Sequence, residues 1–110
     1  MSLTELDPLL SSPKRLACLG AIAAARELEF VALRELLEIS DSDLSKQLKS
    51  LSDAGYVTAR KAGRASTRTT WLAATKPGRA ALADHVAALR KLTDPVALRA
   101  RLPDPVGEPR

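Results

Sequence analysis

The chain has 110 residues, enough for one domain with a single modest core, and its apolar content of 45% excludes a disordered chain. Aromatic residues make up only 3% of it, so the core must consist of Leu, Ala, Val and Ile, which suits packed helices better than a β-sandwich. The net charge of +4 is mild, but it is distributed unevenly along the chain.

The positive charge lies in the middle of the chain. Residues 1–44 carry four cations against eight acids, residues 45–79 carry eight cations against Asp53 alone, and residues 80–110 carry five cations against four acids. This asymmetry predicts a polyanionic partner for the middle segment, because clustered Lys and Arg attract phosphates. A basic surface that is merely solvated is the alternative.

Cysteine content and hydropathy narrow the class of protein. Cys18 is the only cysteine, which excludes an internal disulfide and fits a reducing compartment. No apolar run approaches the roughly 18 residues that a membrane span needs. The first residues lack the basic and apolar segments of an export signal. We therefore expect a cytoplasmic protein with no membrane partner.

A short helical turn is expected within Ser2–Leu10, before the first long helix from Lys14 to about Glu27. Ser12 is the expected cap of that helix, and Pro13 fits its first turn. Gly20 inside the helix could allow a close crossing by another helix. The expected apolar stripe is Leu16, Leu19 and Ala23.

A second short helix is expected over Val31–Leu37, with Leu33, Leu36 and Leu37 as its inward face. The preceding segment, Leu28–Phe30, is too short for an independent strand. It could still pair at the edge of a small sheet.

A third helix is expected from Asp41 to about Ala54. Ser40 is its N-cap, and Asp43 three residues later resembles the second member of a capping box. Gly55 follows as a C-terminal stop. The apolar residues recur at the helical spacing of four and three residues, and they are Leu44, Leu48 and Leu51.

Two extended segments, Tyr56–Lys61 and Arg68–Ala73, flank a turn-forming loop and predict a β-hairpin with a basic tip. A last long helix is expected from its cap Thr75 to about Leu92, with Pro77 in its first turn.

The Pro-rich segment 93–110 is expected to be a poorly ordered tail, apart from a possible turn at Val96–Leu102. The elements predict one domain over residues 1–92 that is mainly α with a small β-hairpin wing. Their order, α-α-α-β-β-α, is that of a winged helix-turn-helix.

The third helix has a face suited to a DNA groove. If its leucines face the core, Ser42, Ser45 and Lys49 align along the exposed side, with Lys46 and Asp41 beside them. Small hydroxyls let a helix backbone approach base edges, and lysines reach guanine acceptors or phosphates. Asp41 is expected to support the helix N-terminus. An ordinary exposed helix face is the alternative.

The hairpin supplies a second group of cations. Arg64 and Arg68, together with Arg60 and Lys61, could contact phosphates or press into a minor groove. A cation-rich hairpin alone is a weak indication, but one directly after a capped helix-turn-helix is stronger. Together these patterns predict binding to double-stranded DNA.

Neither catalysis nor metal binding is indicated. His85 is the only histidine and lies on a different helix from Cys18, so no metal site with usual ligand spacing can be assembled. Cys18 is expected to be buried by packing rather than to act as a redox thiol. His85, beside Asp84, is expected at the surface or in an interface. No nucleophile–base pair, phosphate-binding glycine loop or carboxylate pair is apparent, so we expect neither an enzyme nor a cofactor.

Several segments together resemble one known family. They are Leu6–Leu10, Ser12–Leu16, Glu29–Leu33, Leu44–Leu51, Ala54–Val57, Thr70–Thr75 and Gly78–Arg79. The chain resembles the MarR/ArsR-like winged-helix regulators, and within them the compact subgroup known as winged helix DNA-binding domain proteins. The resemblance covers roughly residues 6–92, and it extends to fold and function but not to a target gene.

The resemblance implies a homodimer that binds a pseudo-palindromic operator, with the terminal helices as its interface. Leu82, Val86 and Leu89 on the last helix, with the Ala-rich first helix, offer more apolar surface than one small core needs. Two-fold symmetry would place the two third helices about one DNA turn apart. A monomer in which the last helix folds back is the alternative.

The leading hypothesis is a sequence-specific DNA-binding regulator that acts as a repressor. The alternative is a winged helix used as a protein-interaction module for an acidic partner, although the hydroxyl-rich face lacks the aromatic anchors usual in protein interfaces. A third hypothesis adds a small-molecule effector between the first and last helices at the dimer seam. The sequence names neither the effector nor the operator.

Overall fold

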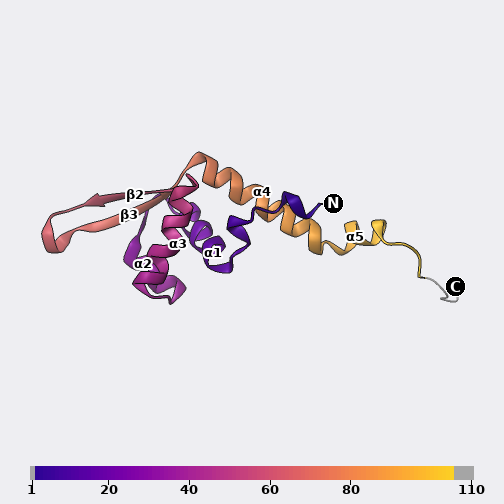
Figure 1. The fold of residues 1–110 in the computed structure, drawn as a ribbon, viewed down its shortest axis with the longest axis horizontal. Helices are drawn as coiled ribbons and strands as arrows, with labels where there is room; N and C mark the ends of the chain where they lie inside the picture. The colour runs from indigo at the N-terminus through magenta and orange to yellow at the C-terminus, as the bar shows by residue number, and fades with distance from the viewer. Residues whose placement is uncertain (1, 106–110) are drawn as a thin grey trace.

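A computed structural model describes residues 2–105 of the chain (Figure 1). Its elements follow the order expected for a winged helix-turn-helix, with a short additional strand before the second helix and a short helix after the last one. They are η1 (Leu3–Glu5), η2 (Leu9–Ser11), α1 (Pro13–Ala24), β1 (Leu28–Glu29), α2 (Phe30–Leu37), α3 (Asp41–Asp53), β2 (Val57–Ala62), η3 (Ala65–Thr67), β3 (Thr69–Ala74), α4 (Lys76–Thr93) and α5 (Pro95–Arg101), where η marks a 3-10 helix.

The starts of the three main helices are capped as expected. In each case the cap hydroxyl accepts a hydrogen bond from the backbone N–H three residues ahead, and the caps are Ser12, Ser40 and Thr75. Proline occupies the first turn of α1 and of α4, where a backbone N–H would have no partner within the helix, so its absence costs nothing. Short polar caps therefore determine where these helices begin.

The three strands form an antiparallel sheet in the order β1-β3-β2, so β3 is central. Leu28 of β1 pairs with Leu72, and β2 pairs with β3 from Val57–Ala74 to Ala62–Thr69. The predicted hairpin is confirmed with each strand displaced by one residue, and so is the predicted edge pairing of Leu28. We call this β2–β3 hairpin, residues 57–74, the wing.

The core lies between the helices and the inner face of the sheet. It confirms the predicted stripe of α3 and the burial of Cys18. Its buried residues are Leu10, Cys18, Leu19, Ile22, Leu33, Leu44, Leu48, Leu51, Val57 and Leu72.

The prediction for Leu36 is wrong, because this side chain is 65% exposed. Leu33 and Leu37 lie one turn apart and occupy the inward side of α2. Leu36 projects roughly 80° around the helix from their mean direction.

The prediction that another helix crosses closely at Gly20 is also wrong, since no atom lies within 4 Å of the position that a Cβ would take there. The tight contact occurs at Gly78 in the first turn of α4. A Cβ at Gly78 would lie 2.1 Å from the backbone oxygen of Tyr56. The absence of a side chain at Gly78 therefore lets α4 pack against the segment that enters the wing.

The N-terminal segment ties α4 to the start of the wing. The backbone N–H of Asp7 donates to Nδ1 of His85 at 3.0 Å, and the Tyr56 hydroxyl donates to the Asp7 carboxylate at 2.5 Å. The latter bond raises the pKa of Tyr56. His85 is only 1% exposed, so the expected surface or interface position is wrong. It is buried because it satisfies a backbone N–H where the chain turns into η2.

The molecule is elongated, measuring 73 × 26 × 20 Å (Figure 1). Its Cα radius of gyration is 18.7 Å, whereas a compact chain of this length has about 13 Å. The wing projects from one end and α4 with α5 from the other. Helix α5 occupies the part of the tail where a turn was expected, and residues 106–110 of that tail lie outside the described residues. Within residues 2–105, no helix is long and apolar enough to cross a membrane.

Candidate nucleic-acid interface

The outward face of α3 carries the side chains predicted to meet DNA. Asp41, Ser42, Ser45, Lys46 and Lys49 are all exposed, while Leu44, Leu48 and Leu51 are buried behind them. The helix therefore presents small hydroxyls and ammonium groups to solvent, as its periodicity predicts.

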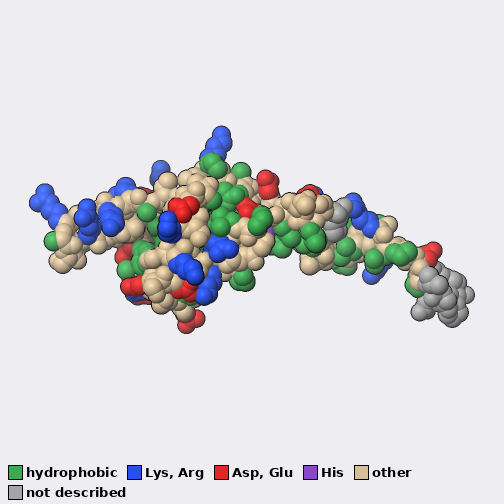
Figure 2. Space-filling model, in the orientation of Figure 1, with side chains coloured by type: hydrophobic (Ala, Val, Ile, Leu, Met, Phe, Trp, Pro, Cys, Tyr) green, Lys and Arg blue, Asp and Glu red, His purple; other side chains and the backbone are tan. Residues whose placement is uncertain are grey.

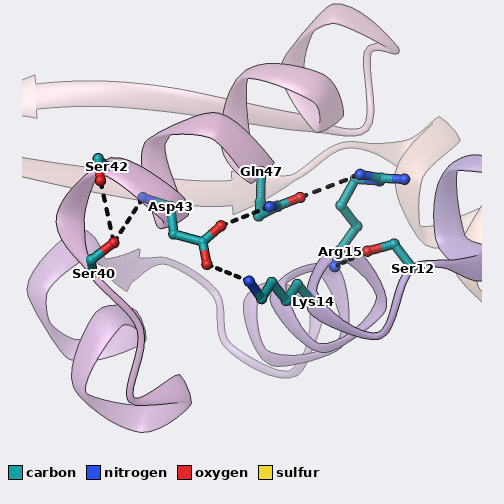
Figure 3. Close-up of polar contacts among 7 residues, drawn as sticks. All are labelled: Ser12, Lys14, Arg15, Ser40, Ser42, Asp43 and Gln47. Carbon is teal, nitrogen blue, oxygen red and sulfur yellow. Dashed lines mark hydrogen bonds and ion pairs between the residues drawn. The ribbon is translucent and has the colours of Figure 1, made fainter.

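A polar network attaches the inner side of α3 to α1 (Figure 3). Lys14 donates to the Asp43 carboxylate at 2.5 Å, and Gln47 donates to its other oxygen at 2.8 Å. Arg15 donates to the Gln47 side-chain oxygen at 3.3 Å and to the backbone oxygen of Leu9 at 2.7 Å. Hydrogen bonds thus join the first half of α3 to both α1 and the N-terminal segment.

The capping box predicted at the start of α3 forms only in part. Ser40 accepts from the backbone N–H of Asp43 at 3.1 Å, but the Asp43 carboxylate binds Lys14 and Gln47. The hydrogen bond from Lys14, followed by that from Gln47, lowers the pKa of Asp43. Asp43 therefore anchors the helix to α1 in addition to its place in the cap.

Gln47 is the buried polar residue that the sequence analysis missed. Its side chain is 7% exposed in the middle of α3. A signal was available, because Gln47 follows Leu44 by three residues and precedes Leu51 by four, which places it on the inward side. Its partner Arg15 belongs to the distant helix α1, and no local pattern points to this contact.

Ion pairs engage part of the exposed charge near α3. Lys49 pairs with Asp53 at 3.1 Å, and Asp41 pairs with Arg34 at 2.6 Å. Lys46 forms no ion pair within the described residues. Exposed pairs of this kind are weak and exchange readily for other partners, so Lys49 remains available to an external anion.

The wing tip has a defined shape. Gly63 has φ of 92° and packs so tightly that a Cβ would lie 2.5 Å from the backbone oxygen of Thr67. Ala65 also has positive φ, at 47°, and the Thr67 hydroxyl donates to the backbone oxygen of Arg64 at 2.7 Å. The tight turn thus presents Arg64 at the end of the wing.

Three of the four cations predicted on the wing are exposed and free of ion pairs within the described part of the chain, and they are Lys61, Arg64 and Arg68. Arg60 differs from them, because its guanidinium binds the Glu27 carboxylate at 3.0 Å. Figure 2 shows Lys and Arg side chains both along the wing and over α3 on one face of the molecule.

The residues predicted to form a dimer interface lie on α4. Leu82, Val86 and Leu89 are all half-buried in the single chain, and Leu82 also packs against the core. An open, mainly apolar groove of about 400 Å³ runs along α4 beside the end of α1. Its lining residues are Ala23, Arg79, Leu82, Ala83, Val86, Ala87 and Arg90. The groove includes Leu82 and Val86 but not Leu89.

No group of three or more His, Cys, Asp or Glu side chains within residues 2–105 could hold a metal ion. Burial raises the pKa of the Cys18 thiol to about 11.

A capped helix-turn-helix, a three-stranded sheet and a basic wing define a winged-helix DNA-binding domain. Residues 14–93 match the sequence profile of the winged helix DNA-binding domain family, and this chain belongs to that family.

Several solved structures, transcriptional regulators among them, share the fold. A transcriptional regulator homologue from Pyrococcus horikoshii OT3 superposes with a TM-score of 0.74 at 20% identity, covering 80% of this chain and 87% of that one. YusO from Bacillus subtilis superposes with a TM-score of 0.70 at 14% identity, covering 84% of this chain. This chain spans 64% of the length of YusO.

The PcaV transcriptional regulator of Streptomyces coelicolor, solved in complex with its natural ligand, gives a TM-score of 0.66 at 16% identity, over 92% of this chain and 69% of that one. No curated protein sequence gives a significant match.

Proposed function

We propose that this protein is a homodimeric transcriptional regulator that binds double-stranded DNA sequence-specifically and acts as a repressor. The observation that carries the proposal is that Lys and Arg side chains lie over α3 and along the wing on one face of the molecule, with the exposed hydroxyls Ser42 and Ser45 on the same helix. The unit that binds DNA and dimerises comprises residues 1–92.

In this proposal α3 enters the major groove. Ser42 and Ser45 allow close approach to base edges, while Lys46 and Lys49 reach guanine acceptors or phosphates. Asp41 pairs with Arg34 at the start of the helix and is not assigned a base contact. Base discrimination therefore comes from α3.

The wing supplies contacts that do not depend on sequence. Lys61, Arg64 and Arg68 neutralise phosphates or enter the minor groove beside the site that α3 reads. The tight turn at Gly63 holds Arg64 at the tip, so this contact is pre-formed.

A second copy of the chain covers the groove on α4. The half-buried Leu82, Val86 and Leu89 would lose their remaining exposure in a two-fold interface, and the two α3 helices would face successive turns of a pseudo-palindromic operator. A small-molecule effector would occupy the same region between α1 and α4.

The test is fluorescence anisotropy of the protein on its own upstream DNA and on scrambled DNA, titrated from low to physiological salt. Selective binding of upstream DNA, with two protomers per duplex by native mass spectrometry, is the expected result. Equal and salt-labile binding to both would contradict sequence specificity. No binding even at low salt would favour the protein-interaction module.

Two variants separate the roles of helix and wing. Arg64→Ala is expected to weaken binding to every sequence and to reduce the salt dependence, because it removes a phosphate contact. Lys49→Ala is expected to change the preference between operators instead. A normal salt slope for Arg64→Ala would remove the wing tip from the contact surface, and a uniform loss for Lys49→Ala would make Lys49 a phosphate anchor.

A further inference from the structure

The Arg60 side chain runs across the sheet. Arg60 in β2 pairs with Trp71 in β3, and Trp71 pairs with Glu29 in β1, so these three residues form one row on one face. The Arg60 guanidinium donates from Nε and Nη2 to the two carboxylate oxygens of Glu27 at 3.0–3.2 Å. Arg60 therefore connects one edge strand of the sheet to the segment that enters the other edge strand.

The neighbouring cation, Lys61, projects from the opposite face. Side chains alternate along a strand, and the burial of Val57 and Leu72 in the core identifies the inner face of the sheet. Lys61 lies four residues after Val57 on the same strand, so its side chain is on the inner side, with α3. Arg60 lies at the alternate position and is on the outer side. Lys61 therefore continues the exposed surface of α3, and Arg60 does not.

The charge of Arg60 is also already balanced. A phosphate contact would require Arg60 to leave a two-pronged ion pair with Glu27 and turn around the edge of the sheet. The pair is 57% and 39% exposed, so it adds little to stability. Its planar, two-pronged geometry instead restricts the direction in which the strand leaves the body of the domain.

We propose that Arg60 and Glu27 form a clamp that positions the wing on the body of the domain, and that Arg60 is a positioning residue rather than a DNA contact. The clamp is a property of the free protein. Its consequence for recognition rests on the proposed function: with the clamp broken, α3 and the wing cations no longer reach their contacts together. The preference for operator over scrambled DNA then falls.

Binding at several salt concentrations separates a positioning residue from a phosphate contact. Lys61→Ala, the matched control on the same strand, should lower the slope of log affinity against log salt by about 0.9, the value of one phosphate contact. Arg60→Ala should leave the slope unchanged and reduce the operator preference several-fold. The exchanged pair Glu27→Arg with Arg60→Glu should restore the preference. A fall of about 0.9 for Arg60→Ala that the exchange does not repair would overturn the proposal.

A measurement without DNA tests the clamp independently of the proposed function. Trp71 is the only tryptophan, and it is half-buried in the same row as Arg60. Arg60→Ala and Glu27→Ala should each shift Trp71 emission to longer wavelength and increase its quenching by acrylamide. Lys61→Ala should do neither, and the exchanged pair should restore the wild-type spectrum.

The two experiments fail in distinguishable ways. An unchanged Trp71 spectrum in Arg60→Ala overturns the clamp whether or not the protein binds DNA. If the wild-type protein binds no DNA at low salt, the proposed function is overturned. The Trp71 spectra alone then test whether Arg60 and Glu27 form the clamp. Circular dichroism confirms that each variant is folded, as expected for an exposed pair.

Discussion

The two regions proposed to meet DNA are attached to the protein in different ways. Helix α3 is held by three buried leucines and by the hydrogen bonds that Asp43 and Gln47 accept from Lys14 and Arg15 of α1. The wing is held by its own strand pairing, by β1 and by the exposed Arg60–Glu27 clamp. Changes behind α3 should therefore affect folding and recognition together, whereas changes on the wing should affect recognition with little cost in stability.

The largest expected effect concerns Cys18, which lies in the core behind α3. Burial raises the pKa of its thiol to about 11, so at pH 8 the reactive thiolate is about 100-fold rarer than in an ordinary cysteine. We expect iodoacetamide to alkylate the native chain at least about 100-fold more slowly than the urea-unfolded chain, as followed by mass spectrometry. Comparable rates would show that the α1–α3 contact opens readily.

The same pKa shift has a consequence for stability. Because the folded thiol ionises at higher pH than the unfolded one, its contribution is fully present below pH 9 and is lost as the pH rises toward about 11. Cys18→Ser should remove this part of the pH dependence of the free energy of unfolding.

The next effect concerns the junction between α4 and the wing. Gly78→Ala should lower the free energy of unfolding by about 3 kcal/mol, because the new Cβ would collide with the backbone of Tyr56. Gly20→Ala is the matched control in another helix, where the space is open, and it should raise that free energy by up to about 1 kcal/mol. Urea denaturation measures both. If both substitutions changed the free energy of unfolding in the same direction, the close contact at Gly78 would not be what determines the packing of α4 against Tyr56.

A smaller effect is expected where α3 meets α1. Gln47→Ala should lower the free energy of unfolding by about 1–2 kcal/mol, since it removes a buried hydrogen-bonding group from between Asp43 and Arg15. Ser45→Ala on the exposed side of the same helix should change it by less than about 0.5 kcal/mol. Equal effects of the two variants would contradict a role for the polar network in seating the helix.

The smallest effect on stability is expected at the wing tip. The double variant Arg64→Ala, Arg68→Ala should unfold within about 0.5 kcal/mol of the wild type. It should nevertheless lower the salt slope of DNA binding by about 1.8, the value of two phosphate contacts. A large loss of stability would show that these cations take part in holding the wing, and the contrast between the two regions would disappear.

The features of α3 were predictable from the sequence because they are local. The cap at Ser40, the spacing of Leu44, Leu48 and Leu51 and the stop at Gly55 are all within one helix, and the structure confirms them. The hairpin was predictable for the same reason, to within one residue.

The features that join distant segments were not predictable. His85 is buried because a backbone N–H 78 positions earlier in the chain meets it, and Arg60 is engaged by Glu27, 33 positions earlier. Leu36 is the opposite case: its spacing predicts burial, but the inward side of its helix is already occupied, so its side chain is exposed. A single sequence contains no local signal for contacts between segments that are far apart in the chain.

The elongation of the chain changes how its mass must be determined. A compact protein with a radius of gyration of 18.7 Å would contain about 280 residues, far more than the 110 of this chain. A monomer should therefore diffuse slowly and elute early from a gel-filtration column, at the position of a globular dimer. An elution volume calibrated with globular standards will overestimate the number of subunits, so sedimentation equilibrium or light scattering, which do not depend on frictional shape, must decide it.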